Sequence, residues 1–231
     1  PLCATRRAII KAMRTLAEFG WTEGSQRKWG ELMLEGLQPA RVVADFGTSL
    51  KLAAPQIISA ELSGKLAHYT HSEATPKVGD WVAVHVTDNG SATVESVVLR
   101  QNEIARKVAG KQVKKQIIAA NVDIAFVLLA LDNDFSIERL RRFLYQLSIS
   151  SIEAVIVLNK ADKSDNVQSY IEQLNLLEQP IIVTTVTSGM GVAEIANRIA
   201  PGHTAILLGS SGVGKSTLTN MLLGREAQAT N

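Results

Sequence analysis

The chain has 231 residues, a formal net charge of +2 at pH 7 and 46% apolar residues. These values suit a globular protein with one large or two modest cores, and the mildly basic charge allows a nucleic-acid partner without requiring one. The single cysteine, Cys3, excludes an internal disulfide and a cysteine-rich zinc site. No apolar run approaches the roughly 18 residues of a membrane span and no signal peptide is visible, so we expect a cytoplasmic protein without a membrane partner.

Residues 1–38 are predicted to form an N-terminal helical segment. Apolar residues recur at helical spacing between residues 5 and 19, and Gly20 is suited to end such a helix. Trp21 and Trp29 follow in a polar stretch. Their rings could stack on nucleic-acid bases, but we favour packing of both against the neighbouring domain.

Residues 39–100 are predicted to form an all-β OB-fold domain. Glycine, proline, aspartate and asparagine separate short runs of β-branched residues, and Asp88-Asn89-Gly90 between two runs is a strong hairpin signal. Five short strands in about sixty residues indicate a small closed barrel. The predicted strands cover residues 42–44, 49–52, 57–62, 81–86 and 92–99.

Residues 101–121 are predicted to be a basic linker. Glu103 is the only acidic residue in this segment, which carries five cationic ones: Arg106, Lys107, Lys111, Lys114 and Lys115. A solvated connector and a strip of cations that faces nucleic-acid phosphates both fit this composition. The sequence leaves the two interpretations open.

Residues 122–231 alternate between apolar runs and amphipathic stretches, and Ser136 is placed to cap the first helix. We predict strands over residues 122–131, 154–158, 180–186 and 204–208. The helices are predicted from Ser136, over 165–178 and 191–199, and from near Gly214. Such alternation is typical of an α/β domain whose parallel sheet carries helices on both faces.

One segment of this domain fits the phosphate-loop pattern G-x-x-x-x-G-K-[ST], between a predicted strand and a predicted helix. Its glycines let backbone amides converge on phosphate oxygens, and the helix N-terminus adds its positive dipole end. Lys215 would reach the β- and γ-phosphates, and the Ser216 hydroxyl would ligate Mg²⁺, so these two are the catalytic candidates. A mere glycine-rich turn is the alternative. The predicted phosphate-binding residues are Gly209, Ser210, Ser211, Gly212, Val213, Gly214, Lys215, Ser216 and Thr217.

A second motif, Asn159-Lys160-Ala161-Asp162, follows the strand predicted to end at Leu158. The Asp162 carboxylate can accept two hydrogen bonds from guanine, whereas adenine offers no donor at either place, so such a site discriminates strongly between the bases. The aliphatic part of Lys160 can lie over the base, and Asn159 can tie the motif to the phosphate loop. A loop with solvated charges is the alternative.

A third element, Thr187-Ser188-Gly189, follows the strand predicted over residues 180–186. In GTPases a loop at this place offers a backbone amide to the guanine O6. We therefore add these three residues to the expected nucleotide site. A plain strand-to-helix turn is the alternative.

The order of the motifs is unusual, because Asn159–Asp162 precedes Gly209–Ser216, whereas an ordinary GTPase carries its phosphate loop first. A nucleotide site depends on spatial placement and not on chain order, so a permuted chain can build it. With this order behind a barrel, the sequence resembles the circularly permuted, small-ribosomal-subunit-dependent GTPases of the RsgA (YjeQ) family.

The resemblance runs from about residue 40 to the C-terminus. It is carried by residues 63–68, 78–82, 119–123, 131–135, 157–162 and 209–217. It implies a GTPase that binds GTP or GDP with Mg²⁺ and acts in late assembly of the small ribosomal subunit. It also implies that the subunit stimulates hydrolysis and that the OB-fold contacts ribosomal RNA. We expect the protein to be a monomer.

The sequence departs from the family pattern downstream of the phosphate loop. The family carries there a switch threonine, a D-x-P-G motif and a zinc-binding Cys/His segment, and none of them occurs in this chain. We therefore expect the native protein to continue beyond Asn231, its zinc ligands to be absent from this chain, and the chain as given to be hydrolysis-deficient. The histidines show no ligand spacing and are interpreted as structural or solvated: His68, His71, His85 and His203.

Two other functions are compatible with the sequence. A P-loop NTPase for adenine nucleotides would require Asn159–Asp162 to be accidental. An RNA-binding OB-fold module would have a P-loop domain that holds nucleotide without hydrolysing it. In that case the candidates for contacting bases or phosphates are His68, Tyr69, Lys65 and Lys77, whereas Trp81 is expected in the core.

Overall fold

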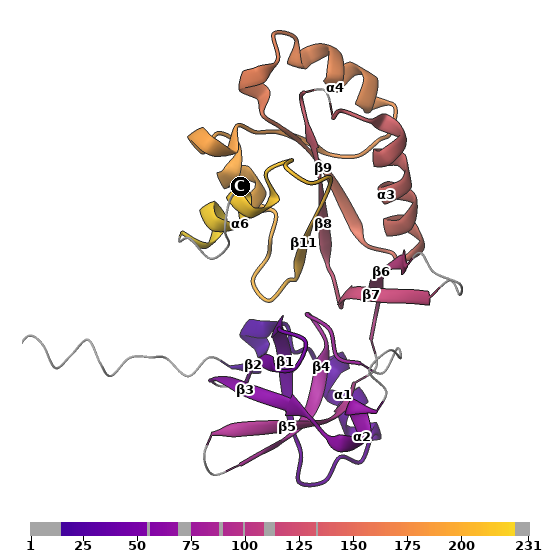
Figure 1. Cartoon of the computed structure of the whole chain (residues 1–231), viewed down its shortest axis with the longest axis vertical. Coiled ribbons are helices and arrows are strands. Elements are labelled where there is room, and N and C mark those ends of the chain that lie inside the picture. Colours follow the sequence, from indigo (N-terminus) through magenta and orange to yellow (C-terminus); the bar gives the residue numbers. More distant parts are fainter. Residues whose placement is uncertain are drawn as a thin grey trace, which may run out of the picture. The chain divides into compact units, whose positions relative to one another are not determined.

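The computed structural model describes residues 15–54, 56–68, 75–87, 90–98, 100–108, 114–132 and 134–224. These residues form two compact units. The barrel unit contains the chain up to Gln101 together with Ala105–Ala120, and the sheet unit contains Asn102–Ile104 and the chain from Asn121 onward. Figure 1 shows the elements of each unit. No helix in the described part of the chain has the length and apolar character needed to cross a membrane.

The N-terminal segment contains a short 3₁₀ turn, η1 (Leu16–Phe19), and a helix, α1 (Glu23–Glu31). The helix predicted over residues 5–19 falls mostly outside the described residues, but its predicted end is correct, because Gly20 closes η1 in the left-handed conformation. The helix α1 lies within the N-terminal segment predicted to be helical, but it was not predicted as a separate helix, since its face carries few apolar residues. Thr22 caps it by accepting a hydrogen bond from the Ser25 amide at 3.2 Å.

The two tryptophans pack within the barrel unit. The Trp21 ring meets Trp29 edge-on with centroids 5.9 Å apart and Trp81 with centroids 4.7 Å apart. The Arg41 guanidinium lies over the Trp81 ring, 5.3 Å from its centroid, and Trp81 is buried. The expected packing role of Trp21 and the expected core position of Trp81 are therefore confirmed.

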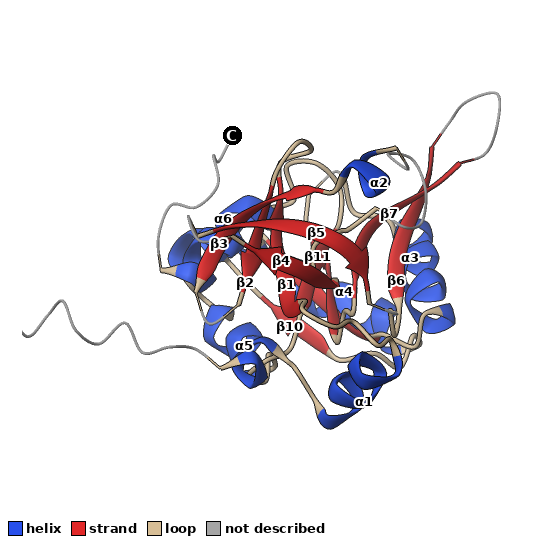
Figure 2. Cartoon of the chain, turned by 90° about the horizontal axis from the view of Figure 1, so that it is seen from below, coloured by secondary structure: helices blue, strands red, loops and turns tan. Residues whose placement is uncertain are grey.

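The predicted barrel is confirmed. Five strands close on themselves in the order β1-β2-β3-β5-β4 (Figure 2). All their pairings are antiparallel except β3 with β5, which is parallel. Inward residues alternate with outward ones along the strands and fill the core, as expected for a small barrel. The strands are β1 (Gln38–Asp45), β2 (Leu50–Ala53), β3 (Ile57–Leu62), β4 (Trp81–Val86) and β5 (Ser91–Val97), and a short helix, α2 (Gly64–Ala67), follows β3.

The hairpin signal at Asp88-Asn89-Gly90 falls partly outside the described residues. The strands on its two sides, β4 and β5, do pair with each other in antiparallel fashion.

Residues 101–121 are not an irregular linker. Two strands, β6 (Glu103–Val108) and β7 (Lys114–Ala120), pair in a two-stranded sheet. The cations suggested a connector, but apolar side chains between them decide the structure, since Ile104 and Ile117 are buried. Arg106 Nε donates to Gln116 Oε1 across the pair at 2.8 Å. Whether the cations of this segment face phosphates stays a prediction.

The sheet unit contains the predicted parallel sheet. Its four strands lie in the order β10-β9-β8-β11, and every neighbouring pair is parallel. The strands are β8 (Ile124–Ala130), β9 (Glu153–Asn159), β10 (Ile181–Val183) and β11 (Ala205–Leu208). The longer helices are α3 (Ile137–Ile149), α4 (Val167–Asn175), α5 (Val192–Asn197) and α6 (Lys215–Leu223).

Helices cover both faces of this sheet, as predicted. Every second residue of β8, including Phe126 and Leu128, shares a buried cluster with Ile195 of α5 and Leu218 of α6. The alternate residues of β8 point to the opposite face, where α3 contacts β8 and β9 (Figure 1). The strand order reverses between β8 and β11. In open parallel sheets the crevice at the carboxyl ends of such strands is the usual ligand site.

Candidate nucleotide-binding site

The predicted phosphate loop joins the carboxyl end of β11 to the first turn of α6. Its backbone permits only glycine at two places. A β-carbon at Gly209, where φ is 143°, would lie 2.7 Å from the Leu128 carbonyl oxygen, and one at Gly214, where φ is 106°, would lie 2.4 Å from Asn159 Nδ2. The loop is therefore lined by main chain at the start of a nine-residue helix, an arrangement suited to phosphate oxygens.

Lys215 is the first residue of α6, and its ammonium group folds back over the loop. Its Nζ donates to the Gly209 carbonyl oxygen at 3.0 Å and to that of Ser210 at 2.5 Å. Burial lowers the pKa of Lys215 below its ordinary value. A partly desolvated cation at this position gains much from an added anionic phosphate.

Asn159, at the end of β9, is buried and joins three segments of the site. Its Nδ2 donates to the Val213 carbonyl oxygen at 2.8 Å, which ties β9 to the phosphate loop. Its Oδ1 accepts from Thr184 Oγ1 at 3.1 Å and from the Val186 amide at 3.2 Å. The sequence-based expectation that Asn159 ties its motif to the phosphate loop is thus met by an observed hydrogen bond.

The next residues of the motif lie at the rim of the site. Lys160 adopts a left-handed conformation with φ of 60°, and its Nζ lies 2.8 Å from Asp132 Oδ2. The hydrogen bond from Lys160 is the main reason why the pKa of Asp132 is lowered. Asp162 follows in the 3₁₀ turn η2 (Ala161–Lys163), where its carboxylate is exposed to solvent. An exposed carboxylate here is accessible to a base.

Thr187, Ser188 and Gly189 lie in and directly after a 3₁₀ turn, η3 (Val186–Ser188), which contacts α6. The Ser188 amide donates to the Thr185 carbonyl oxygen at 3.0 Å, and the Gly189 amide donates to that of Val186 at 3.1 Å. These two amides are therefore engaged within the turn, which makes the Thr187 amide the better candidate for the guanine O6. The structure brings all three predicted motifs to the same edge of the sheet.

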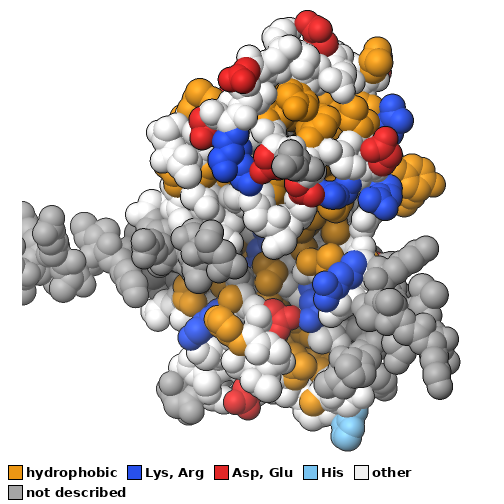
Figure 3. Space-filling view, turned by 45° about the horizontal axis from the view of Figure 1, so that its top comes forward, with side chains coloured by type: hydrophobic (Ala, Val, Ile, Leu, Met, Phe, Trp, Pro, Cys, Tyr) orange, Lys and Arg blue, Asp and Glu red, His pale blue; other side chains and the backbone are white. Residues whose placement is uncertain are grey.

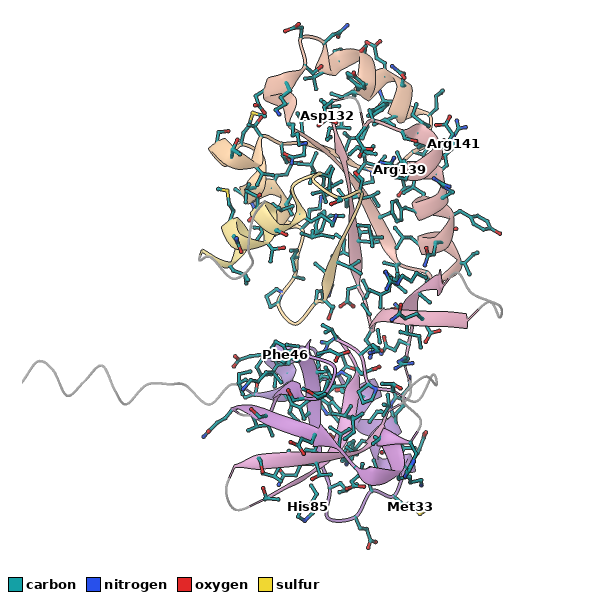
Figure 4. All side chains as sticks on the ribbon, viewed as in Figure 1. Met33, Phe46, His85, Asp132, Arg139 and Arg141 are labelled. Atoms are coloured by element: carbon teal, nitrogen blue, oxygen red, sulfur yellow. The ribbon has the colours of Figure 1, made fainter. Side chains whose placement is uncertain are left out.

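Two aspartates of the site were not singled out as site residues from the sequence. Asp132 and Asp134 follow β8, and Figure 4 shows Asp132 and Arg139 in this part of the sheet unit. Ser210 Oγ of the phosphate loop donates to Asp134 Oδ2, and Arg139 Nη1 donates to both oxygens of the same carboxylate at 2.9 Å. Polar residues directly after a buried parallel strand were the available signal.

Charged side chains of both signs lie on the surface of the sheet unit. On the face in view, Figure 3 shows cationic and anionic side chains interspersed. Among the described residues, no group of three or more histidine, cysteine, aspartate or glutamate side chains is placed to hold a metal ion.

The barrel unit has an exposed aromatic side chain that was not among the base-contacting candidates from the sequence. Phe46, in the turn between β1 and β2, is 65% exposed (Figure 4). Beside it the Asp45 carboxylate pairs with Lys77 Nζ at 2.7 Å. Burial raises the pKa of Asp45, but the hydrogen bonds from Lys77 and the Gly47 amide outweigh it and lower the pKa overall. Tyr69, a candidate from the sequence, lies outside the described residues.

Comparison with known protein families shows which family the chain belongs to. The family model described as "RsgA GTPase" matches residues 97–231, more than half of the sequence. The chain belongs to the RsgA GTPase family. Curated relatives agree with this. The small ribosomal subunit biogenesis GTPase RsgA of Opitutus terrae is 33% identical over 229 residues, which cover 94% of this chain and 62% of the relative.

Other RsgA proteins and solved structures fit the same family. RsgA 2 of Vibrio vulnificus is 36% identical over 220 residues, which cover 94% of this chain and 60% of the relative. The crystal structure of YjeQ from Thermotoga maritima matches with a TM-score of 0.61 and 25% identity, over 80% of this chain and 65% of that one. YloQ, a circularly permuted GTPase, shows the same fold with a TM-score of 0.59, at 22% identity and over 81% of this chain and 65% of that one. The chain thus spans about three fifths of the length of its curated RsgA relatives.

Proposed function

We propose that this chain holds a guanine nucleotide with Mg²⁺, and that the whole protein hydrolyses GTP during late maturation of the small ribosomal subunit in the cytoplasm. The observation that carries the proposal is the hydrogen bond from Asn159 to Val213, which joins the base-recognition segment to the phosphate loop. The relatives are small ribosomal subunit biogenesis GTPases, which supports the proposed biological role.

Each part of the site has a distinct task in this proposal. The amides of residues 211–217 and the Lys215 ammonium hold the phosphates, whose charge the α6 N-terminus also favours. The half-buried Ser216 hydroxyl, in the first turn of α6, would supply a ligand to Mg²⁺. Such an ion would neutralise charge on the phosphates. Phosphoryl transfer needs mainly positioning and charge stabilisation, which this loop provides.

Recognition of guanine is assigned to Asp162 and the stem of Lys160. The exposed Asp162 carboxylate accepts hydrogen bonds from the ring N–H and the exocyclic amine of guanine. Adenine would leave the carboxylate without a donor, which costs orders of magnitude in affinity. The Thr187 amide completes the arrangement by donating to the base oxygen.

Calorimetric titration of the chain with GDP and with ADP, each with Mg²⁺, tests the assignment. We expect GDP to bind, ADP to bind at least about a hundredfold more weakly, and the Asp162→Ala variant to lose this preference. Asp165→Ala is the matched control, because it removes an exposed carboxylate only three residues further along the same segment. Equal binding of GDP and ADP by the unaltered chain would overturn the guanine assignment.

An RNA-binding role of the barrel unit is the second part of the proposal. OB-folds stack bases on exposed aromatic side chains near cationic groups, and the exposed Phe46 is next in the chain to Asp45, whose carboxylate pairs with Lys77. We expect Phe46→Ala to weaken binding of isolated small subunits or of single-stranded ribosomal RNA by about fivefold to a hundredfold, because one stacked base contributes about 1–3 kcal/mol.

Ile57→Ala serves as its control, since Ile57 is a comparably exposed apolar residue of the same barrel. Binding that is equally weakened in both variants would contradict a specific stacking role for Phe46. If the chain binds RNA but neither GDP nor GTP, the alternative of an RNA-binding module gains support. The monomeric state stays a prediction, which light scattering can check.

A further inference from the structure

The phosphate loop has two anchors, and only one of them lies in the three motifs assigned to the nucleotide site. Asn159 holds the C-terminal half of the loop through the Val213 carbonyl. The N-terminal half is held by Asp134, whose Oδ2 accepts the hydrogen bond from Ser210 Oγ. Asp134 lies in the segment between β8 and α3, so the loop is fixed from the ends of two neighbouring strands.

Asp134 is itself held in place before any ligand arrives. Arg139 Nη1 donates to both carboxylate oxygens at 2.9 Å and to the Asp134 carbonyl oxygen at 3.3 Å. The Asp134 amide donates to Asp132 Oδ1 at 3.0 Å, and Asp132 in turn pairs with Lys160. The carboxylate is therefore oriented toward Ser210 by contacts from its own segment and from α3.

The charge state of Asp134 suits this task. The hydrogen bond from Ser210 and, after it, that from Arg139 hold the pKa of Asp134 below its ordinary value. An ionised carboxylate only accepts hydrogen bonds, so it fixes the Ser210 hydroxyl as a donor. The same serine provides one of the carbonyl oxygens that Lys215 contacts, at 2.5 Å.

We propose that Asp134 is a positioning residue that orients the N-terminal half of the phosphate loop through Ser210. A loop that is already ordered loses less conformational freedom when phosphates bind, and its affinity for the nucleotide is higher. The inference rests on the proposed guanine-nucleotide site and deepens it. It adds a residue to that site which lies in none of the three motifs.

The first test needs no nucleotide. Amide hydrogen exchange of the nucleotide-free chain is compared for the unaltered protein, Ser210→Ala and Ser210→Thr. We expect amide exchange in a peptide covering residues 205–215 to be about threefold faster in Ser210→Ala than in the unaltered protein, because the hydrogen bond to Asp134 is lost. Exchange in Ser210→Thr should match that of the unaltered protein. Ser148→Ala is the matched control, since Ser148 Oγ also donates to a protein oxygen, that of Tyr145 at 2.8 Å, at the far end of α3.

The second test is a double-mutant cycle on GDP affinity with Ser210→Ala, Asp134→Ala and both together. We expect each single change to weaken GDP binding by about fivefold and the double variant to be no weaker than Asp134→Ala alone, since one shared hydrogen bond to a charged group is lost. Ser210→Thr keeps the donor and should stay within about twofold of the unaltered chain.

Two results would overturn the inference. One is unchanged exchange and unchanged GDP affinity in Ser210→Ala. The other is a double variant whose fold-loss of GDP affinity equals the product of the losses in the two single variants, which would show that Ser210 and Asp134 act independently. If the unaltered chain binds no GDP, the proposed function fails, whereas the exchange comparison still decides whether Asp134 holds the loop.

Discussion

At the scale of single residues, the charge of Lys215 is partly desolvated in the absence of a ligand, which is unfavourable until an anionic ligand binds. Its ammonium group is partly buried against two carbonyl oxygens, and this burial lowers its pKa. Anionic phosphates would restore the charge balance. The residue therefore contributes more to ligand binding than to folding, as is common at functional sites.

We expect Lys215→Ala to weaken GDP binding at least about a hundredfold, while the free energy of unfolding changes by less than about 1 kcal/mol. The physical reason is that the variant loses the contact with the phosphates but also removes a partly desolvated charge. Calorimetric titration and urea unfolding measure the two quantities. A large loss of stability together with unchanged GDP affinity would contradict this role for Lys215.

The pair of Lys160 and Asp132 gives a pH dependence with a defined sign. The pKa of Asp132 is lowered in the folded state below its ordinary value, first by the hydrogen bond from Lys160. A lowered carboxyl pKa contributes stability above the unfolded pKa and loses it as the pH falls through the folded value. The stabilisation from this pair should therefore be constant near neutral pH.

We accordingly expect Asp132→Asn to be less stable than the unaltered chain by the same amount between about pH 5 and pH 8, where Asp132 is ionised in both states. Below about pH 4 the difference should shrink toward zero. Denaturant unfolding at several pH values measures it. A difference that persists unchanged at pH 2.5 would show that the effect of Asp132 is not electrostatic.

The sequence predicted the residues of the site that belong to motifs, because their chemistry is local. The glycine spacing of the phosphate-loop pattern indicates Gly209 and Gly214, and in the structure a β-carbon at either position would meet other atoms. The place of Asn159 at the end of a buried strand indicates that residue. Asp134 lies in residues 131–135, which carry part of the family resemblance, but its contact with the phosphate loop could not be predicted, because its partner Ser210 is remote along the chain. Only the sheet order, which places β8 beside β11, brings the two together.

At the scale of elements, local pattern and observed structure agree wherever apolar residues recur with a clear period. The five barrel strands and the four sheet strands were predicted close to their observed positions. The missed elements are α1, α2 and the β6–β7 pair. The helix α1 is stabilised by its cap and by the contact of its own Trp29 with Trp21, and the β6–β7 pair by buried isoleucines between its cations. In these elements tertiary contacts outweigh the local composition.

The start of β4 carries a buried ion pair that fixes the barrel. Asp80 is fully buried, and its oxygens accept from Arg100 Nε and Nη2 at 2.7 Å each and from the Lys77 amide at 2.7 Å. Removing one partner of such a pair leaves a buried charge without compensation. We expect Asp80→Ala to lower the free energy of unfolding by about 3–5 kcal/mol.

Urea unfolding followed by tryptophan fluorescence measures this loss, since Trp81 adjoins Asp80 in the chain. Lys51→Ala is the control, because its hydrogen bond to Ser59 Oγ lies on the exposed surface of the barrel and should matter by less than about 0.5 kcal/mol. Equal stability of the two variants would show that the Asp80–Arg100 pair does not determine the stability of the barrel.

At the scale of the whole molecule, two units with separate hydrophobic cores share one chain. The barrel core and the core of the sheet unit contain no residue in common, and every proposed nucleotide-binding residue belongs to the sheet unit. The prediction of fold class from sequence succeeded for both units because their periodicities differ, alternation in the barrel and strand–helix repetition in the sheet. A ligand of one unit should therefore stabilise mainly that unit.

Scanning calorimetry of the chain with and without GDP tests this separation. Leu52 is completely buried in the barrel core, so Leu52→Ala should destabilise the barrel transition by about 2–5 kcal/mol and leave GDP affinity unchanged. GDP at about a hundred times its Kd should stabilise the other transition by about 2.7 kcal/mol. Leu147→Ala, at a buried position of α3, is the counterpart that lowers the GDP-responsive transition. If a single transition responds to both leucine variants and to GDP, the two units fold as one cooperative body, and the binding energy of the nucleotide is shared by the barrel.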